Sequence, residues 1–177
     1  MTKPIKLARK NFLSSLDMST EEVIHIIELA NKFKNKDINF LLRNYVLGLI
    51  FDKSSTRTRV SFQVAMSRLG GTTIDLNPST SQIGRGEPIK DTARVLSRYC
   101  DVLAIRTFKQ SVLEEYAKWS SKPVINALTD IEHPCQALAD FMTIKENFID
   151  FDNVVLTFIG DGNLSLIHIS EPTRPRL

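Results

Sequence analysis

Short apolar runs alternate with amphipathic stretches along most of the chain. The runs are rich in Val, Ile and Leu and bounded by polar residues, as is typical of buried strands; they lie at 45–50, 72–76, 101–106, 124–126 and 153–159. Between them, apolar residues recur at helical spacing within 20–33, 60–69, 89–99, 112–117 and 134–144. This alternation predicts an α/β fold with a mostly parallel sheet and helices on both of its faces.

The ends of the predicted elements carry recognisable signals. Ser19 to Glu22 matches a capping box and should open the first helix, while Gly70-Gly71 should close the second. A polar loop at 77–87 precedes Pro88, which suits the first position of a helix. The length and composition of this loop fit either a mobile surface excursion or a lid, and the sequence leaves both open.

The polar stretch after the first predicted strand, 51–59, is the strongest candidate for chemistry. Free backbone N–H groups and the positive end of the helix dipole gather where a strand turns into a helix. Here the hydroxyls of Ser55, Thr56 and Thr58 add donors, and Arg57 adds a planar fork that matches phosphate oxygens. A simple helix cap needs only one hydroxyl, so the cluster favours a phosphate site. The glycine pattern of a nucleotide-binding loop is absent, which favours a small phosphorylated substrate.

Further polar residues follow two other predicted strands. Arg106 ends the strand at 101–106, and His133 and Gln136 open the helix after the strand at 124–126. Ligands of parallel sheets bind at the carboxyl ends of the strands, so we expect these side chains to converge with Arg57. His133 and Gln136 suit a carbonyl or amide group attached to the phosphate, although His133 could also be an ordinary helix-entry residue. Chemistry here would rest on positioning and charge stabilisation.

Composition narrows the class of protein. The formal net charge of +3 is mild, so neither nucleic acid nor a membrane surface is indicated as a partner. Cys100 and Cys135 lack metal-ligand spacing, which predicts no metal site and suits a reducing compartment. The amino-terminal residues are charged throughout, and no apolar run reaches membrane-spanning length. We therefore expect a cytoplasmic protein.

Two motifs together resemble a known family. Phe51-x-Lys53-x-Ser55-Thr56-Arg57-Thr58-Arg59, followed by His133-Pro134-x-Gln136, resembles the carbamoyltransferases, which include the ornithine and aspartate enzymes. The resemblance covers about residues 8–163. Within the family, the segments 81–87, 91–96, 105–106 and 125–130 look like the ornithine branch. The aspartate branch usually has a lysine before the Gly-Glu of the polar loop, where this chain has Arg85.

The resemblance implies a reaction and a set of site residues. Carbamoyl phosphate would be held by Ser55, Thr56, Arg57, Thr58, Arg106, His133 and Gln136, with Gln82 reaching in from a neighbouring subunit of a homotrimer. The δ-amine of L-ornithine would attack the carbonyl carbon, giving L-citrulline and phosphate in arginine biosynthesis. The catalytic residues would be Arg57, which stabilises the leaving phosphate, and Arg106 and His133, which stabilise the oxyanion. No metal or organic cofactor is implied.

The resemblance also divides the chain. Residues 1–150 would be the carbamoyl-phosphate-binding domain, 151–163 the start of an ornithine-binding domain, and 164–177 a non-native tail that matches no family segment. Leu164 stands where ornithine enzymes carry a second Asn after the Gly-Asp-Gly-Asn turn. With the acceptor domain largely missing, we expect the chain alone to be nearly inactive. Alternatives are an aspartate or putrescine carbamoyltransferase and, in another class, a non-enzymatic carbamoyl-phosphate or anion-binding module.

Overall fold

The computed structural model describes residues 7–35, 42–77, 81–148, 154, 155 and 157. The strand predicted at 153–159 and the segments assigned to 151–163 and 164–177 therefore lie outside the described residues, apart from 154, 155 and 157. None of the described helices combines the length and apolar composition needed to cross a membrane.

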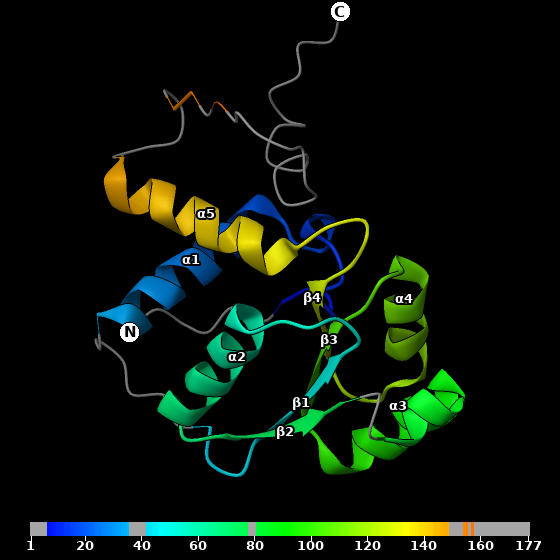
Figure 1. Cartoon of the computed structure of the whole chain (residues 1–177). Helices are drawn as coiled ribbons and strands as arrows, with labels where there is room; N and C mark the ends of the chain where they lie inside the picture. Colours follow the sequence, from blue (N-terminus) through cyan, green and yellow to red (C-terminus); the bar gives the residue numbers. More distant parts are fainter. Residues whose placement is uncertain (1–6, 36–41, 78–80, 149–153, 156, 158–177) are drawn as a thin grey trace, which may run out of the picture.

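The described sheet has four parallel strands in the order β2-β1-β3-β4 (Figure 1). Their bounds are β1 Val46–Phe51, β2 Thr72–Leu76, β3 Val102–Arg106 and β4 Val124–Leu128. Each lies within one or two residues of a predicted apolar run. The prediction of a parallel sheet is confirmed.

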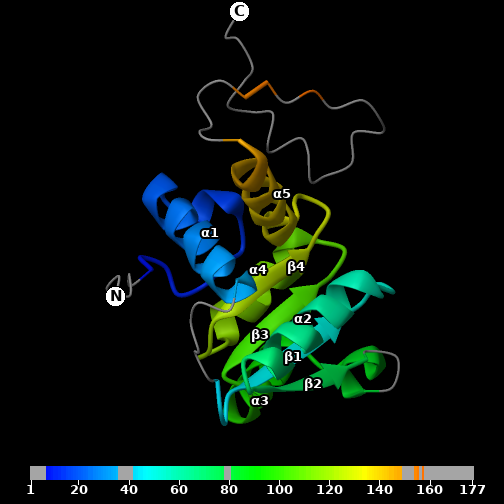
Figure 2. The same cartoon turned by 90° about the vertical axis from the view of Figure 1, so that its left-hand side faces the viewer.

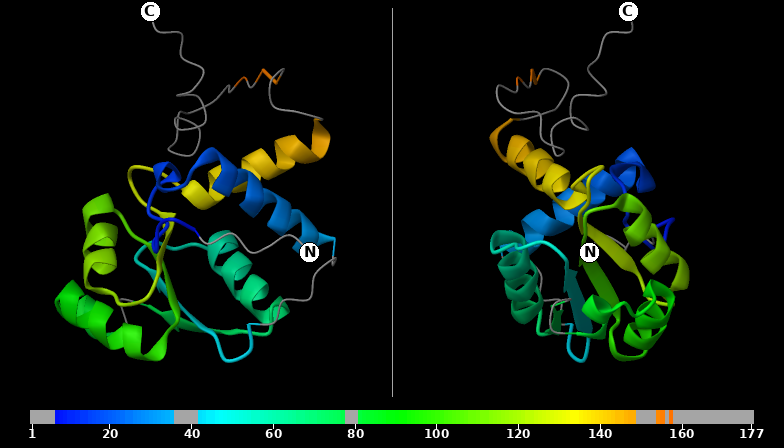
Figure 3. Two further views of the ribbon diagram at one scale, coloured as in Figure 1. Left: turned by 180° about the vertical axis from the view of Figure 1, so that it is seen from behind. Right: turned by 45° about the vertical axis from the view of Figure 1, so that its right-hand side comes forward.

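Helices cover both faces of the sheet, as predicted. They are α1 Thr20–Lys34, α2 Arg57–Arg68, α3 Ile89–Tyr99, α4 Gln110–Trp119 and α5 Pro134–Asn147, with short 3₁₀ helices η1 Ser15–Asp17 and η3 Gln82–Arg85. Helix α2 lies on one face, whereas α3 and α4 pack together on the other (Figure 3). Helices α1 and α5 pack against each other, and α5 also contacts β4 (Figure 2).

Alternate residues of the strands build two apolar layers. Beneath α3 and α4 the buried cluster comprises Ile50, Ala93, Cys100, Leu103, Ile105, Leu113, Tyr116 and Val124. Beneath α2 it comprises Leu47, Leu49, Phe51, Ala104 and Ala127, covered by Phe62 and Met66. Gly48 has no room for a side chain, since an added Cβ would lie 2.8 Å from Leu103 Cδ2. Burial on both faces explains why the strands read as continuous apolar runs.

Helix starts agree with the sequence signals at α1 and differ from them at α2 and α3. The capping box of α1 is present: Ser19 Oγ accepts from the N–H of Glu22, whose carboxylate accepts from the N–H of Ser19. Helix α2 begins at Arg57, earlier than the periodicity at Val60 indicated, so the motif arginines lie in its first turn. Pro88 takes the N-cap of α3 and Ile89 is its first residue.

Candidate functional site

The strand order places a topological switch point between β1 and β3. From β1 the chain passes through α2 to β2 on one side of β1, and β3 then pairs with the other side. In open parallel sheets, ligands bind in the crevice at the carboxyl ends of the two strands at such a point. The two ends are joined here, because the N–H of Asp52 donates to the carbonyl of Arg106 at 2.9 Å.

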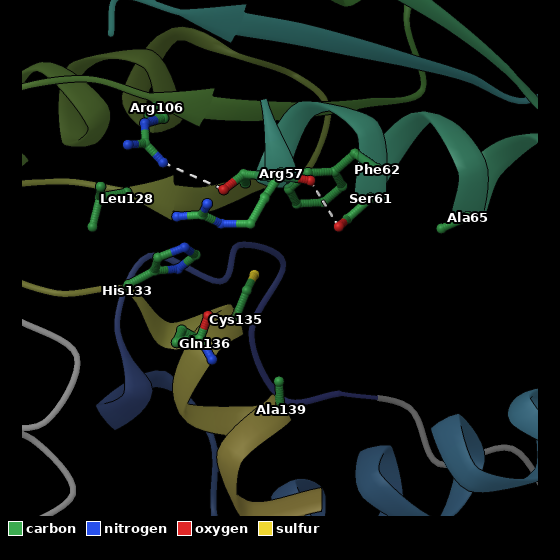
Figure 4. A pocket seen from close by; sticks show the side chains of 11 residues that line it. Arg57, Ser61, Phe62, Ala65, Arg106, Leu128, His133, Cys135, Gln136 and Ala139 are labelled. Carbon is green, nitrogen blue, oxygen red and sulfur yellow. Dashed lines mark hydrogen bonds between the residues drawn. The ribbon is translucent and has the colours of Figure 1, made fainter. Parts of the chain in front are cut away.

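A cavity of about 770 Å³ opens at this point. Of the residues that the sequence predicted for the site, it brings together Arg57, Thr58, Arg106, His133 and Gln136 (Figure 4). Arg57 and Thr58 come from the start of α2, Arg106 from the end of β3, and His133 and Gln136 from the start of α5. The lining contains two guanidinium groups and no carboxylate, so the cavity favours an anion.

The first turn of α2 presents Arg57 and Thr58 to the cavity. Thr56 is the N-cap, and its side chain makes no capping hydrogen bond. The simple-cap interpretation therefore does not account for this hydroxyl. Thr58 Oγ1 accepts a hydrogen bond of 3.3 Å from Arg106 Nη1, which links the motif to the end of β3. The N–H groups of the first helical turn have no partners within the helix and add to the positive potential there.

Arg106 is half-buried at the last position of β3. Its Nε atom is buried and has no hydrogen-bond partner, and burial lowers the pKa of its guanidinium, which remains charged at neutral pH. A β-bulge lies opposite: Ile105 pairs with Asn126 but Arg106 pairs with Leu128, so an extra residue of β4 is accommodated between them. Bulges redirect side chains next to functional sites, and this one places Leu128 in the cavity wall.

His133 is the N-cap residue of α5, and its ring points into the cavity toward the side of Arg57 and Arg106 (Figure 4). Its Nδ1 atom is buried and has no hydrogen-bond partner. Burial and the nearby Arg106 charge lower the pKa of the imidazole, and Asp140 opposes this only in part. At neutral pH the imidazole is therefore neutral. Gln136, in the first turn of the helix, donates from Nε2 to Asp140 Oδ1 at 2.9 Å.

Cys135 also lines the cavity, and its environment makes it unreactive. Its Sγ atom donates to the carbonyl of Asn126 at 3.4 Å, and burial raises the pKa of the thiol to about 12. The thiolate, which is the nucleophilic form, is thus scarcely populated at neutral pH. Within the described parts of the chain, no group of three His, Cys, Asp or Glu side chains is arranged to hold a metal ion.

Other predicted residues do not line the cavity. Ser55 and Thr56 lie in the turn before α2, and Gln82 lies exposed in η3. Arg59 turns away: its Nε is 3.3 Å from Asp75 Oδ2, and its guanidinium lies over the Phe51 ring.

Several lining residues were not singled out from the sequence: Ser61, Phe62, Ala65, Leu128, Cys135 and Ala139. Ser61 and Ala65 follow Arg57 at four-residue spacing along α2, so helical periodicity would have found them. Nothing in the sequence signals Leu128, because its place depends on the bulge.

Comparison with known proteins agrees with this architecture. Residues 10–146 match the family model described as the aspartate/ornithine carbamoyltransferase, carbamoyl-P binding domain. The chain belongs to the aspartate/ornithine carbamoyltransferase family. The family resemblance found in the sequence is thereby confirmed, and the matched residues contain the whole described sheet together with the cavity.

Individual members of the family match closely. The chain is 79% identical over 163 residues to the ornithine carbamoyltransferase of Prochlorococcus marinus subsp. pastoris, covering 92% of this chain and 53% of that protein. The crystal structure of ornithine carbamoyltransferase from Gloeobacter violaceus superposes with a TM-score of 0.81 at 50% identity, covering 89% of this chain and 52% of that one. The enzyme from Thermus thermophilus superposes with a TM-score of 0.86 at 36% identity, covering 92% and 57%. The chain thus spans about half the length of these relatives.

Proposed function

We propose that this chain forms the carbamoyl-phosphate-binding part of an ornithine carbamoyltransferase. The reaction transfers the carbamoyl group of carbamoyl phosphate to the δ-amine of L-ornithine and yields L-citrulline and phosphate. One observation carries the proposal: two guanidiniums, a threonine hydroxyl, an imidazole and a carboxamide meet around one cavity whose lining has no carboxylate.

The phosphate would bind between α2 and β3. Arg57 and Arg106 neutralise its two negative charges, and the Thr58 hydroxyl and the free N–H groups of the α2 start complete the cradle. Ser55 and Thr56 contribute donors from the preceding turn. A phosphate oxygen would also give the buried Nε of Arg106 the partner that it lacks.

The carbamoyl group would lie toward α5. The neutral imidazole of His133 and the carboxamide of Gln136 are matched to its carbonyl oxygen and amide. Binding there would satisfy the unpartnered Nδ1 of His133 if that atom carries the proton. A neutral imidazole adds no third positive charge, so the two guanidiniums balance the charge of the phosphate.

Transfer would proceed by addition and elimination. The uncharged δ-amine forms a C–N bond to the carbonyl carbon, and negative charge develops on the carbonyl oxygen, stabilised by Arg106, Thr58 and His133. The bond between carbon and the bridging oxygen then breaks, phosphate leaves with its charge stabilised by Arg57, and the phosphate takes up the proton that the amine loses. The protein contributes position and charge, in keeping with a cavity that offers no activated nucleophile.

The acceptor amine is assigned from the relatives. The Prochlorococcus marinus and Gloeobacter violaceus proteins are named ornithine carbamoyltransferases, and identity to them is 79% and 50%. Because the chain alone is expected to be nearly inactive, sensitive analysis of the small amount of product formed from carbamoyl phosphate with ornithine, aspartate or putrescine tests the assignment. Citrulline alone supports it, whereas carbamoyl aspartate or carbamoylputrescine as the main product would contradict it.

Gln82 and the homotrimer form the last part of the proposal. Gln82 lies exposed on η3 and does not line the cavity of its own chain, which fits a role in the site of a neighbouring subunit. Sedimentation analysis of the purified chain tests the assembly. If a trimer forms, Gln82→Ala should weaken the binding of carbamoyl phosphate.

The unpaired thiols of Cys100 and Cys135 suit a protein that works in the cytoplasm.

Calorimetric titration of the chain with carbamoyl phosphate is the decisive experiment. Arg57→Ala should abolish binding, while Arg68→Ala, the same change in the last turn of the same helix, should leave it intact. Circular dichroism melts establish that each variant is folded. Binding that survives Arg57→Ala would refute the phosphate cradle. Equal affinities for carbamoyl phosphate and inorganic phosphate would favour a simple anion-binding module.

A further inference from the structure

The residues before α1 run along the outer edge of β4. This N-terminal segment, residues 11–15, forms a parallel bridge between Phe12 and Ile125. The N–H of Phe12 donates to the carbonyl of Val124 at 2.9 Å, and the N–H of Asn126 donates back to the carbonyl of Phe12 at 2.8 Å. The segment therefore follows β4 toward its carboxyl end, where the site lies.

At that end the segment is tied to the turn that carries His133. The N–H of Ser15 donates to Glu132 Oε2 at 2.9 Å. Asn126 Nδ2 donates to the carbonyl of Leu13 at 2.9 Å and to that of Glu132 at 3.5 Å. Glu132 immediately precedes His133, so these contacts hold the backbone from which the imidazole projects.

Glu132 is an unusual residue to bury. Only 3% of it is exposed, and it takes part in none of the ion pairs found within the described chain. A carboxylate held in this way, with the Ser15 N–H as its hydrogen-bond partner, is costly to desolvate. An apolar side chain could not accept this hydrogen bond and would leave the Ser15 N–H without its partner, so the acceptor oxygen of Glu132 is what joins the two segments.

His133 depends on its backbone for orientation. Its φ of −127° and ψ of 77° fall outside regular helix or strand, and no side-chain cap is formed. Its Nδ1 has no partner to fix the ring. Small movements of Glu132 would therefore change where the imidazole points in the cavity.

We infer that Glu132 is a positioning residue. Through its hydrogen bond to the Ser15 N–H it fixes the turn between β4 and α5 against the N-terminal segment, and thereby aims His133 at the carbamoyl group. The inference rests on the proposed function for the role of His133. It predicts a defect that is specific to the carbamoyl group, because the guanidiniums that hold the phosphate lie on other elements.

Titration with two ligands separates positioning from stability. Glu132→Ala should weaken binding of carbamoyl phosphate about tenfold, with binding of inorganic phosphate changed less than about twofold. Glu132→Gln, whose amide oxygen can still accept from Ser15, should stay close to the wild type. Ser97→Ala is the matched control, since it breaks a buried hydrogen-bond network with Ser120 and so lowers stability away from the cavity.

A second pair of variants tests the hydrogen bond itself. Ser15→Pro removes the N–H that donates a hydrogen bond to Glu132. Proline is tolerated there because Ser15 is the first residue of η1 and the preceding Ser14 is already extended. Ser15→Ala keeps the N–H and is its control. Ser15→Pro should reproduce the selective loss of Glu132→Ala, and Ser15→Ala should not. This pair also decides the matter if Glu132→Ala fails to fold.

Nuclear magnetic resonance of the His133 imidazole supplies a readout that does not need ligand. Its resonances and titration should change in Glu132→Ala and Ser15→Pro, and stay unchanged in Ser97→Ala. Equal weakening of both ligands, or the same changes in Ser97→Ala, would overturn the inference. If the wild-type chain binds carbamoyl phosphate and inorganic phosphate equally well, the proposed contact between His133 and the carbamoyl group is refuted. Unchanged His133 resonances in Ser15→Pro would separately refute positioning by Glu132.

Discussion

Replacing Arg106 by glutamine removes one positive charge from the cavity and keeps an amide that can donate. In the ligand-free protein Arg106 donates to Thr58 at 3.3 Å, while its Nε is buried without a partner. The wild-type side chain therefore carries a desolvation cost that a bound anion would offset. We expect Arg106→Gln to bind phosphate much more weakly and to be at least as stable as the wild type when ligand-free.

The size of the binding loss follows from the contacts removed. Each hydrogen bond to a charged group contributes about 1.5–3 kcal/mol, and the guanidinium fork can make two to a phosphate. Glutamine restores one bond that is not charge-assisted, worth about 1 kcal/mol. The net loss is about 2–5 kcal/mol, which raises the dissociation constant roughly 30- to 4000-fold.

Calorimetric titration with inorganic phosphate at one fixed, low ionic strength measures this loss, since salt screens the charges. Arg98→Gln, the same change on an exposed residue of α3 on the opposite face of the sheet, is the control. Phosphate should raise the melting temperature of the wild type and of Arg98→Gln more than that of Arg106→Gln. A change of less than about threefold in the affinity of Arg106→Gln would refute the assignment of Arg106 to the phosphate cradle.

Three further predictions concern stability, and urea unfolding measures each. The pKa of His133 lies below its ordinary value of 6.5 in the folded protein, so its contribution to stability is complete above pH 6.5 and is lost as the pH falls toward the folded pKa. Gly48→Ala should cost about 1–3 kcal/mol, because the added Cβ would lie 2.8 Å from Leu103 Cδ2 and 2.9 Å from Cys100 Sγ. Ser19→Ala should cost about 1 kcal/mol by removing the cap of α1.

Each of these predictions has a result that contradicts it. His133→Gln should show a weaker loss of stability on acidification than the wild type, and identical pH dependence in the two proteins would exclude a role for the imidazole. Gly48→Ala with wild-type stability would mean that the side chains of Leu103 and Cys100 can move away from the added Cβ without cost. An unchanged unfolding midpoint for Ser19→Ala would mean that the N-cap of α1 contributes nothing.

Most secondary structure was predictable because its signals are local. The strands are buried on both faces and therefore appear as apolar runs, while the helices are amphipathic and show their period in the sequence. The start of α2 was placed too late for the same reason. Its first turn, from Arg57 to Arg59, contains no apolar residue, so periodicity begins only at Val60. The assignment of Gln82 to a neighbouring subunit stays a prediction.

The sequence by itself determined the α/β class and placed Arg57, Arg106, His133 and Gln136 at the ends of strands, because strand ends and helix starts depend on neighbouring residues. Only the tertiary structure decided that β1 and β3 adjoin, which brings those ends around one cavity. It also decided the bulge at Leu128 and the pairing of Phe12 with β4. These features come from contacts between residues far apart in the chain, so no local pattern of residues encodes them.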